Sequence, residues 1–312
     1  MIRDEPRSTT SEPLFTDDVL ARLRRVILRS RRLARSGLSG EHRALRKGPS
    51  PEFADFKSYT VGDDYRRIDW RAYARFDALY VRESEITTEF DVHLLVDVSN
   101  SMEWSSDPRI PTKLRRALQL TGALGYLSLW HFDRVSITPV GSDAQRRFGP
   151  VQGRTNIRHM LSWIERLHAQ REGDLTAALS RLVFERRRAG ILLIVSDFLS
   201  EDFERLETAM RGAVGRGWEI ALLQVYDPAE ADPVTWPELN ETNQAIDLET
   251  SARMPIRNDA ASVAGYLERR QAWLDELTTL GGGVRTLHVQ IPTTQHVDQS
   301  LVQLLRTIGL VS

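Results

Sequence analysis

Hydrophobic residues along this chain form short continuous runs that alternate with segments of helical periodicity. The most apolar runs are "VHLLVD", "GILLIVSD" and "WEIALLQVYD", which begin at residues 92, 190 and 218. A short apolar run bounded by polar residues is typical of a strand that is buried on both faces. Strands of this kind separated by helices predict an α/β fold, with a mostly parallel sheet and helices on both of its faces.

The order of the elements is also predicted by the pattern. From residue 91 onward, the spacing indicates a strand, a helix, two strands, two helices, a strand, a helix and a strand. The first helix, after Trp104, repeats apolar residues so broadly that little of it should be exposed. A long helix that ends at the glycines 281–283, the strand "VRTLHVQI" and a closing helix from Gln299 to Ile308 follow.

The chain is expected to divide into three segments. Residues 1–17 mix acids, prolines and hydroxyl side chains and are expected to be a disordered leader. Residues 18–90 hold an N-terminal helix over 18–35, which has many arginines, and a small β-rich extension. The arginines are either a surface for phosphates or lipid headgroups or the solvated face of a packed helix. Residues 91–312 hold the sheet domain with additions at its C-terminus.

The extension, residues 48–90, is rich in aromatic residues and interrupted by glycine and proline. Each large ring contributes on the order of 2 kcal/mol on burial, and the extension lacks the aliphatic content for a core of its own. We therefore expect it to pack against the sheet domain, with Gly-Asp-Asp at 62–64 in a tight turn and Asp69 bonded to a nearby arginine. Its charged residues are either a structural network above Trp70 and Tyr73 or a second functional surface.

Composition narrows the possible partners. The chain has 42 Lys+Arg and 43 Asp+Glu, and this formal net charge of -1 gives no reason to expect a nucleic acid or an anionic membrane as partner. The absence of cysteine excludes disulfides, thiolate nucleophiles and Cys-based zinc sites, and it fits a cytoplasmic protein. No apolar stretch approaches the roughly 20 residues needed to span a bilayer.

Side chains with oxygen atoms follow two of the buried strands. Asp97 ends the first strand and is followed by Ser99 and Ser101 at alternate positions, and Asp197 ends the second. Ligands of an open parallel sheet bind outside the carboxyl ends of its strands, so neighbouring strands would bring these side chains to one crevice. Oxygen ligands suit a hard cation, and Mg²⁺ is expected, with Mn²⁺ or Ca²⁺ as alternatives. With so few carboxylate ligands, the cation keeps part of its positive charge and can accept a carboxylate from another protein.

The segment "DVSNSM" after a buried strand resembles the Asp-x-Ser-x-Ser core of the metal-ion-dependent adhesion site in von Willebrand factor type A domains. "VSD" at 195–197 resembles the later aspartate of these domains, and the predicted order of elements matches their fold. The resemblance implies a von Willebrand factor type A-like, Rossmann-like sheet domain. The metal ligands that it implies are Asp97, Ser99, Ser101 and Asp197.

A longer resemblance covers most of the chain. Residues 52–85, "EFADFKSYTVGDDYRRIDWRAYARFDALYVRESE", resemble the hallmark segment of the bacterial domain-of-unknown-function 58 family, and "AIDLET" at 245–250 extends the likeness. That family is associated with MoxR-type AAA+ ATPases, which are thought to act as chaperones. The resemblance therefore implies a non-enzymatic adaptor or co-chaperone. Its partners would be a MoxR-type ATPase and a client protein that offers an acidic residue.

One position departs from the pattern of these families. They usually have a threonine in the loop before the third helix, either as a further ligand or as a hydroxyl that bonds to the ligands, whereas "REGDLTAAL" has Gly173 there. Thr176 lies one helical step later, and Thr155 lies in an earlier loop. Metal affinity is therefore in question, and a water or Asp174 is the expected substitute.

Two other interpretations of Asp97 stay open. Asp97 and Ser99 would serve as a simple helix cap, although a cap needs one such residue and not three. Alternatively, Asp97, with Lys113 and Asp197 downstream, resembles the nucleophile of haloacid-dehalogenase-like phosphohydrolases, which use a metal. Those enzymes usually have a second aspartate, the general acid, at the position of Ser99. Because this acid is missing, we expect the chain not to be an enzyme.

Overall fold

The structure is a computed structural model. It describes residues 13–22, 53–59, 68–84, 90–141, 147–171, 173–186, 188–199, 202–231, 244–246, 248, 253–255, 260–283, 285–300 and 303. The chain forms two units, one of residues 39–89 and one that combines residues 1–38 with residues 90–312.

The smaller unit contains a two-stranded antiparallel sheet and one helix. Strand β1 (Phe53–Ser58) pairs with β2 (Tyr80–Ser84), and helix α2 (Trp70–Phe76) lies between them in sequence. The Oδ1 atom of Asp69 accepts hydrogen bonds from the backbone N–H groups two and three residues later, at 2.8 and 3.2 Å. Asp69 therefore caps the N-terminus of α2 through this oxygen, and its predicted bond to an arginine stays a prediction.

The smaller unit does not bury all of its aromatic side chains. Trp70 is 65% exposed and Tyr73 is 42% exposed, and their rings meet edge to face with centroids 6.3 Å apart. The predicted turn at 62–64 lies outside the described residues. The packing of this extension against the sheet domain stays a prediction.

A six-stranded sheet forms the centre of the larger unit, in the order β10-β7-β6-β3-β4-β5. Neighbouring strands are parallel except β4 and β5, which are antiparallel. The strands are β3 (Asp91–Asp97), β4 (Arg134–Val140), β5 (Phe148–Gln152), β6 (Ile191–Ser196), β7 (Glu219–Tyr226) and β10 (Thr286–Pro292). This confirms the predicted mostly parallel sheet and the predicted order of elements from residue 91.

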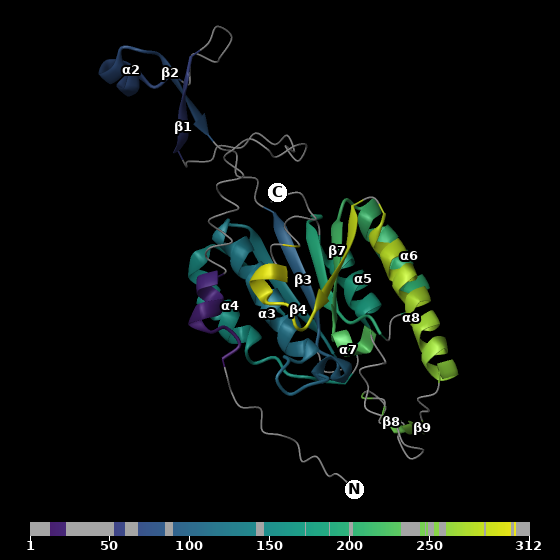
Figure 1. Ribbon diagram of the computed structural model, residues 1–312. Helices are drawn as coiled ribbons and strands as arrows, with labels where there is room; N and C mark the ends of the chain where they lie inside the picture. The colour runs from purple at the N-terminus through teal and green to yellow at the C-terminus, as the bar shows by residue number, and fades with distance from the viewer. Residues whose placement is uncertain are drawn as a thin grey trace. The chain divides into compact units, whose positions relative to one another are not determined.

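The strand residues alternate between two hydrophobic cores, one on each face of the sheet. In β3, Leu94 and Val96 belong to one core and Leu95 belongs to the other. Because helices cover both faces, the strands are apolar along most of their length. The first core includes α3 (Lys113–Trp130) and α4 (Ile157–Ile164), and the second includes α5 (Leu175–Glu185), α6 (Phe203–Gly215) and α8 (Ala260–Gly281) (Figure 1).

The first described residues pack on α3. Leu14 and Phe15 are 7% and 8% exposed and belong to the first core. The ring of Phe15 lies directly over Gly122, where a Cβ atom would not fit. The side chain of Gln119 donates a hydrogen bond to the carbonyl oxygen of Leu14. Two apolar residues within the predicted leader, residues 1–17, are therefore buried.

Shorter elements complete the described chain. They are η2 (Asn100–Glu103), η3 (Arg154–Asn156), α7 (Pro228–Ala231) and the antiparallel pair β8 (Gln244–Ile246) and β9 (Arg253–Pro255). The helix predicted over 18–35 begins at residue 17 and is described to residue 22, and most of the predicted closing helix also lies outside the described residues. Within the described ranges, no helix combines the length and the apolar character that crossing a membrane requires.

Candidate functional site

The carboxyl ends of β3 and β6 meet at one edge of the sheet. The two strands are parallel neighbours, and Val96 is paired with Val195. Asp97 is the last residue of β3, and Asp197 directly follows β6. The charge of Asp197 contributes to the raised pKa of Asp97. The fold thus brings both predicted aspartates to the same edge.

Hydrogen bonds hold both carboxylate oxygens of Asp97. The Oδ1 atom accepts a bond from the backbone N–H of Ser99 at 2.9 Å, and Oδ2 accepts one from the hydroxyl of Ser196 at 2.5 Å. Burial and the charge of Asp197 raise the pKa of Asp97 from 3.8 to about 6, against the effect of the bonds from Ser196 and Ser99. Ser196 was not among the predicted site residues, since it reaches Asp97 only because two strands that are far apart in sequence pair in the sheet.

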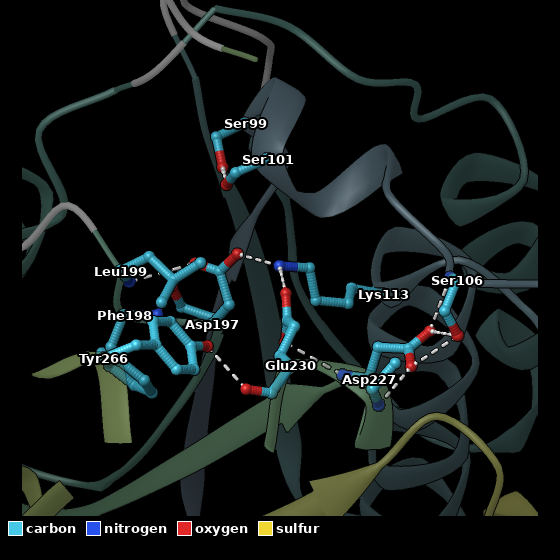
Figure 2. Close-up of polar contacts among 12 residues, drawn as sticks. Ser99, Ser101, Ser106, Lys113, Asp197, Phe198, Leu199, Asp227, Glu230 and Tyr266 are labelled. Carbon is cyan, nitrogen blue, oxygen red and sulfur yellow. Dashed lines mark hydrogen bonds and ion pairs between the residues drawn. The ribbon is translucent and has the colours of Figure 1, made fainter. Parts of the chain in front are cut away.

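The hydroxyl groups of Ser99 and Ser101 lie side by side. Their Oγ atoms are 3.0 Å apart, and Ser99 is 3% exposed while Ser101 is half-buried (Figure 2). Ser99 is the residue that precedes η2, but its side chain makes no capping hydrogen bond to this short helix. The interpretation of Ser99 as a simple helix cap is therefore wrong. The two hydroxyls instead lie against each other, and the backbone N–H of Ser99 bonds to Asp97.

Asp197 is bonded to a lysine. Its Oδ2 atom accepts a hydrogen bond from Nζ of Lys113 at 2.7 Å, and its Oδ1 atom accepts one from the backbone N–H of Leu199 at 3.2 Å (Figure 2). Phe198, which lies between Asp197 and Leu199, has a φ of 58°, a conformation that is costly for a bulky residue. Lys113 of α3 and the loop after β6 therefore each supply a donor to one oxygen of Asp197.

Lys113 joins Asp197 to a third carboxylate. Its Nζ atom also donates to Oε1 of Glu230, at 2.7 Å. Burial opposes the charged form of Lys113, but the carboxylates of Asp197 and Glu230 outweigh this effect and raise its pKa. Burial raises the pKa of Glu230, and Lys113 counteracts the rise. Glu230 gave no signal in the sequence, because it lies in a four-residue helix outside the recognisable motifs.

Further hydrogen bonds tie α7 to its surroundings. Asp227 is fully buried, and its carboxylate accepts bonds from the backbone N–H and the hydroxyl of Ser106, at 2.8 to 2.9 Å. Oε2 of Glu230 accepts a bond from the N–H of Asp227 at 3.1 Å, and the hydroxyl of Tyr266 donates to the carbonyl oxygen of Glu230 at 2.6 Å. Figure 2 shows this connected set of contacts, which links α3, α7 and α8.

The backbone fills the space where the expected threonine side chain would lie. A Cβ atom at Gly173 would be 2.6 Å from the nitrogen and 2.8 Å from the Cα atom of Gly141, so only glycine fits. Asp174, the suggested substitute ligand, caps α5 through a bond from the N–H of Ala177 at 2.7 Å, and it also pairs with Arg205 at 3.0 Å. The loop therefore requires glycine at position 173, where related domains usually have threonine.

The donor atoms fit a hard cation in part. Asp97, Ser99 and Ser101 supply one carboxylate and two hydroxyl groups, which are oxygen ligands of the kind that Mg²⁺ and Mn²⁺ accept together with water. Asp197, the fourth predicted ligand, is in contact with a cation of the protein, Lys113. Within the described part of the chain, there is no group of three or more His, Cys, Asp or Glu side chains that could hold a metal ion. A metal here would depend on the serines, and its binding stays a prediction.

The sheet order and the composition of the strand ends define the class of this protein. An α/β domain with this strand order, and an Asp-x-Ser-x-Ser sequence at the end of a central strand, is a von Willebrand factor type A-like domain. Residues 55–265, more than half of the chain, match the family described as "Protein of unknown function DUF58", and the chain belongs to this family.

Relatives of the chain occur in mycobacteria. One uncharacterized protein of Mycobacterium bovis and two of Mycobacterium tuberculosis are each 28% identical to it over 233 residues, which make up 73% of this chain and 72% of each relative.

Solved structures with similar folds include von Willebrand factor type A domains. The SpRpn10 VWA domain has a TM-score of 0.39 and 10% identity over 69% of this chain and 95% of its own. The pilus adhesin SpaC of Lactobacillus rhamnosus GG has a TM-score of 0.43 and 11% identity over 72% of this chain and 31% of its own. Manganese-loaded TRAP of Plasmodium vivax has a TM-score of 0.34 and 18% identity over 44% of this chain and 57% of its own. Since these scores are low, the fold assignment rests on strand order and connectivity.

Proposed function

We propose that this chain is a protein-interaction module that binds an acidic side chain of its partner at the edge of the sheet where β3 and β6 end. The observation that carries the proposal is the pair of hydroxyls of Ser99 and Ser101, which lie 3.0 Å apart just after Asp97 in the chain. Asp97, Ser99 and Ser101 would hold a divalent cation, Mg²⁺ in the first place, with Mn²⁺ or Ca²⁺ as alternatives. When bound, the ion supplies a positive charge that a carboxylate from outside the chain can neutralise.

Two neighbouring groups fix the orientation of the Asp97 carboxylate. The hydroxyl of Ser196 and the backbone N–H of Ser99 each hold one oxygen of Asp97. Because burial raises the pKa of Asp97 to about 6, a cation competes with a proton for this carboxylate in acidic solution. The site is therefore expected to bind metal weakly in isolation and more weakly at low pH.

The partners that we propose are a MoxR-type AAA+ ATPase and a client protein that offers the acidic residue. The family resemblance supports this, and the chain has no phosphate-binding loop of its own, so nucleotide-driven work would come from the ATPase. The chain would act as an adaptor or co-chaperone in protein maturation or remodelling. Because this work consumes ATP, we expect it to take place in the cytoplasm.

The test is capture of partners by the tagged full-length chain from its own cells, in Mg²⁺ and in chelator. Replacing both Ser99 and Ser101 with alanine should reduce capture of the MoxR-type ATPase or client by tenfold or more. Ser180→Ala, on the exposed side of α5, is the matched control and should capture normally. Equal capture by all variants, with or without Mg²⁺, would overturn the site. Recovery of clients without a MoxR-type ATPase would refute the proposed ATPase partner and leave the proposed binding site standing.

The phosphohydrolase alternative has less support. Ser99, at the position of the missing general acid, has its hydroxyl against that of Ser101, and Lys113 is bonded to Asp197 and Glu230. We expect no metal-dependent hydrolysis of p-nitrophenyl phosphate. Turnover that disappears in Asp97→Asn would restore the enzymatic interpretation.

A further inference from the structure

An arginine and two aromatic rings come together at the amino-terminal edge of the sheet, where β3 and β4 begin. This edge is opposite the one proposed to bind an acidic side chain, since Asp97 lies at the other end of β3. Trp130 is the last residue of α3, and Phe132 lies in the turn between α3 and β4. Arg154 follows β5, which runs antiparallel to β4 and therefore ends at this edge. We call Trp130, Phe132 and Arg154 the aromatic–arginine cluster.

The side chain of Arg154 is exposed, but contacts within the cluster hold it in one place. Its Cζ atom lies 4.2 Å from the centroid of the Trp130 ring and 5.2 Å from that of Phe132. Its Nε atom donates a hydrogen bond to the carbonyl oxygen of Trp130 at 3.3 Å. The Trp130 ring stacks on the buried ring of Tyr126, with centroids 5.9 Å apart. Because the guanidinium is ordered in advance, a partner that binds it loses less conformational entropy.

The backbone of Phe132 is strained, although its side chain is not buried. Its φ is 66°, a conformation that is costly for a bulky residue, and its side chain is 42% exposed. The side chain of Gln152 donates a hydrogen bond to the carbonyl oxygen of Phe132 at 2.6 Å, which holds the turn. Phe90, whose N–H donates to Asp133 at 3.1 Å, is a second ring at this edge that is 42% exposed. A costly backbone that keeps an aromatic ring at the surface is typical of a functional contact.

The charge of this edge is positive where the cluster meets α4. Arg154 lies in η3 and Arg158 lies one helical turn later in α4, and both side chains are exposed. Among the described residues, no carboxylate pairs with either of them, whereas Arg109, Arg205 and Arg211 each pair with an aspartate or glutamate. A partner with negative charge would therefore be complementary to this surface.

We propose that the aromatic–arginine cluster, with Phe90 at the same edge, is a docking site for an acidic peptide segment of a partner protein. The two Nη groups of Arg154 bind a carboxylate of the segment in a bidentate manner. The rings of Phe132 and Phe90 contact its apolar side chains, and arginine and aromatic residues are the types that contribute most at protein interfaces. The site lies beyond the proposed function, because it needs no metal ion and none of the residues where β3 and β6 end.

The test is selection from a library of random displayed peptides on the purified full chain, in chelator so that no divalent cation contributes. The selected peptides should be rich in Asp and Glu, and one of them, labelled with fluorescein, is then titrated by fluorescence polarisation. Arg154→Glu should weaken its binding tenfold or more, and Arg154→Lys, which keeps the charge but not the planar donors, should also weaken it. Arg181→Glu, an equal change of charge at an exposed position of α5, is the matched control and should bind normally. A library that yields no acidic peptides, or equal binding by Arg154→Glu and the natural protein, would overturn the proposal.

Further variants separate docking from packing and from the proposed function. Glycine adopts the φ of Phe132 without strain, so Phe132→Gly should melt within a few degrees of the natural protein and yet bind the labelled peptide several-fold more weakly. Unchanged peptide binding by Phe132→Gly would refute the contact with the ring. Replacing both Ser99 and Ser101 with alanine should leave peptide binding intact, and its loss there would place the peptide at the other edge and overturn the docking site. Binding to phosphatidylserine vesicles that Arg154→Glu abolishes, without peptide binding, would assign the cluster to a membrane surface instead.

Discussion

Replacing Gly173 with alanine should destabilise the protein, because the backbone of Gly141 fills the space that a side chain would need. A Cβ atom at position 173 would lie 2.6 Å from the nitrogen of Gly141 and 2.8 Å from its Cα atom. Both atoms belong to the backbone, so no change of rotamer relieves the contact. The φ of Gly173 is not in the left-handed region, and the expected effect is therefore steric.

The size of the effect follows from this geometry. Overpacking of this kind costs about 1–3 kcal/mol of unfolding free energy. For a chain of this size each kcal/mol lowers the melting temperature by roughly 2–4 °C. Gly212 on α6 is the control, because no atom lies within 4 Å of the Cβ that alanine would add there. Gly212→Ala should raise the stability by about 0.5–1 kcal/mol, as removal of a glycine from a helix does.

The assay is urea unfolding followed by circular dichroism, for the natural protein and both variants. Gly173→Ala should unfold at a lower urea concentration and Gly212→Ala at a higher one. A Gly173→Ala variant as stable as the natural protein would show that the loop at Gly141 moves freely and would refute the steric argument. Gly173→Thr, which adds the hydroxyl usual in related domains, should lose stability without gaining Mg²⁺ affinity.

Two further predictions concern pH and the N-terminal segment. Burial and the charge of Asp197 raise the pKa of Asp97 from 3.8 to about 6. Between these two values, the folded state therefore holds a proton that the unfolded state releases. The stability that this proton contributes is present at low pH and is lost as the pH rises from about 4 to about 6. In chelator, the unfolding free energy of the natural protein relative to Asp97→Asn should fall by about 1–3 kcal/mol across that pH window and stay constant above it. If the unfolding free energies of the two proteins change in parallel with pH, the prediction is contradicted. Phe15→Ala should cost about 3–5 kcal/mol in thermal or urea unfolding, since the ring is buried over Gly122, whereas Phe184→Ala, at a side chain that is 82% exposed, should change the stability by less than about 0.5 kcal/mol. Equal stability of these two variants would show that the N-terminal segment does not pack on α3.

Local patterns in the sequence were sufficient to predict the sheet and the position of its aspartates. Consecutive strand residues point to opposite faces, and both faces are covered by helices, so uninterrupted apolar runs such as the one around Leu94 and Leu95 indicate buried parallel strands. The end of a run marks the end of a strand, which placed Asp97 and Asp197 at one edge. The limit of the N-terminal leader was not predictable in this way, because Leu14 and Phe15 are too few to form a periodic pattern.

The tertiary structure alone decided what surrounds those aspartates. Lys113 is 84 residues from Asp197 and 117 residues from Glu230 in sequence, and Ser196 is 99 residues from Asp97. A lysine at the start of a helix is ordinarily a solvated residue, and only the positions of β6 and α7 bury this one. Hydrogen bonds and ion pairs form between atoms that lie within a few ångströms, and the sequence separation of their residues does not determine this distance. The sequence therefore determined which residues stand at the strand ends, and the packing of distant elements determined that Asp197 faces a cation of the protein itself.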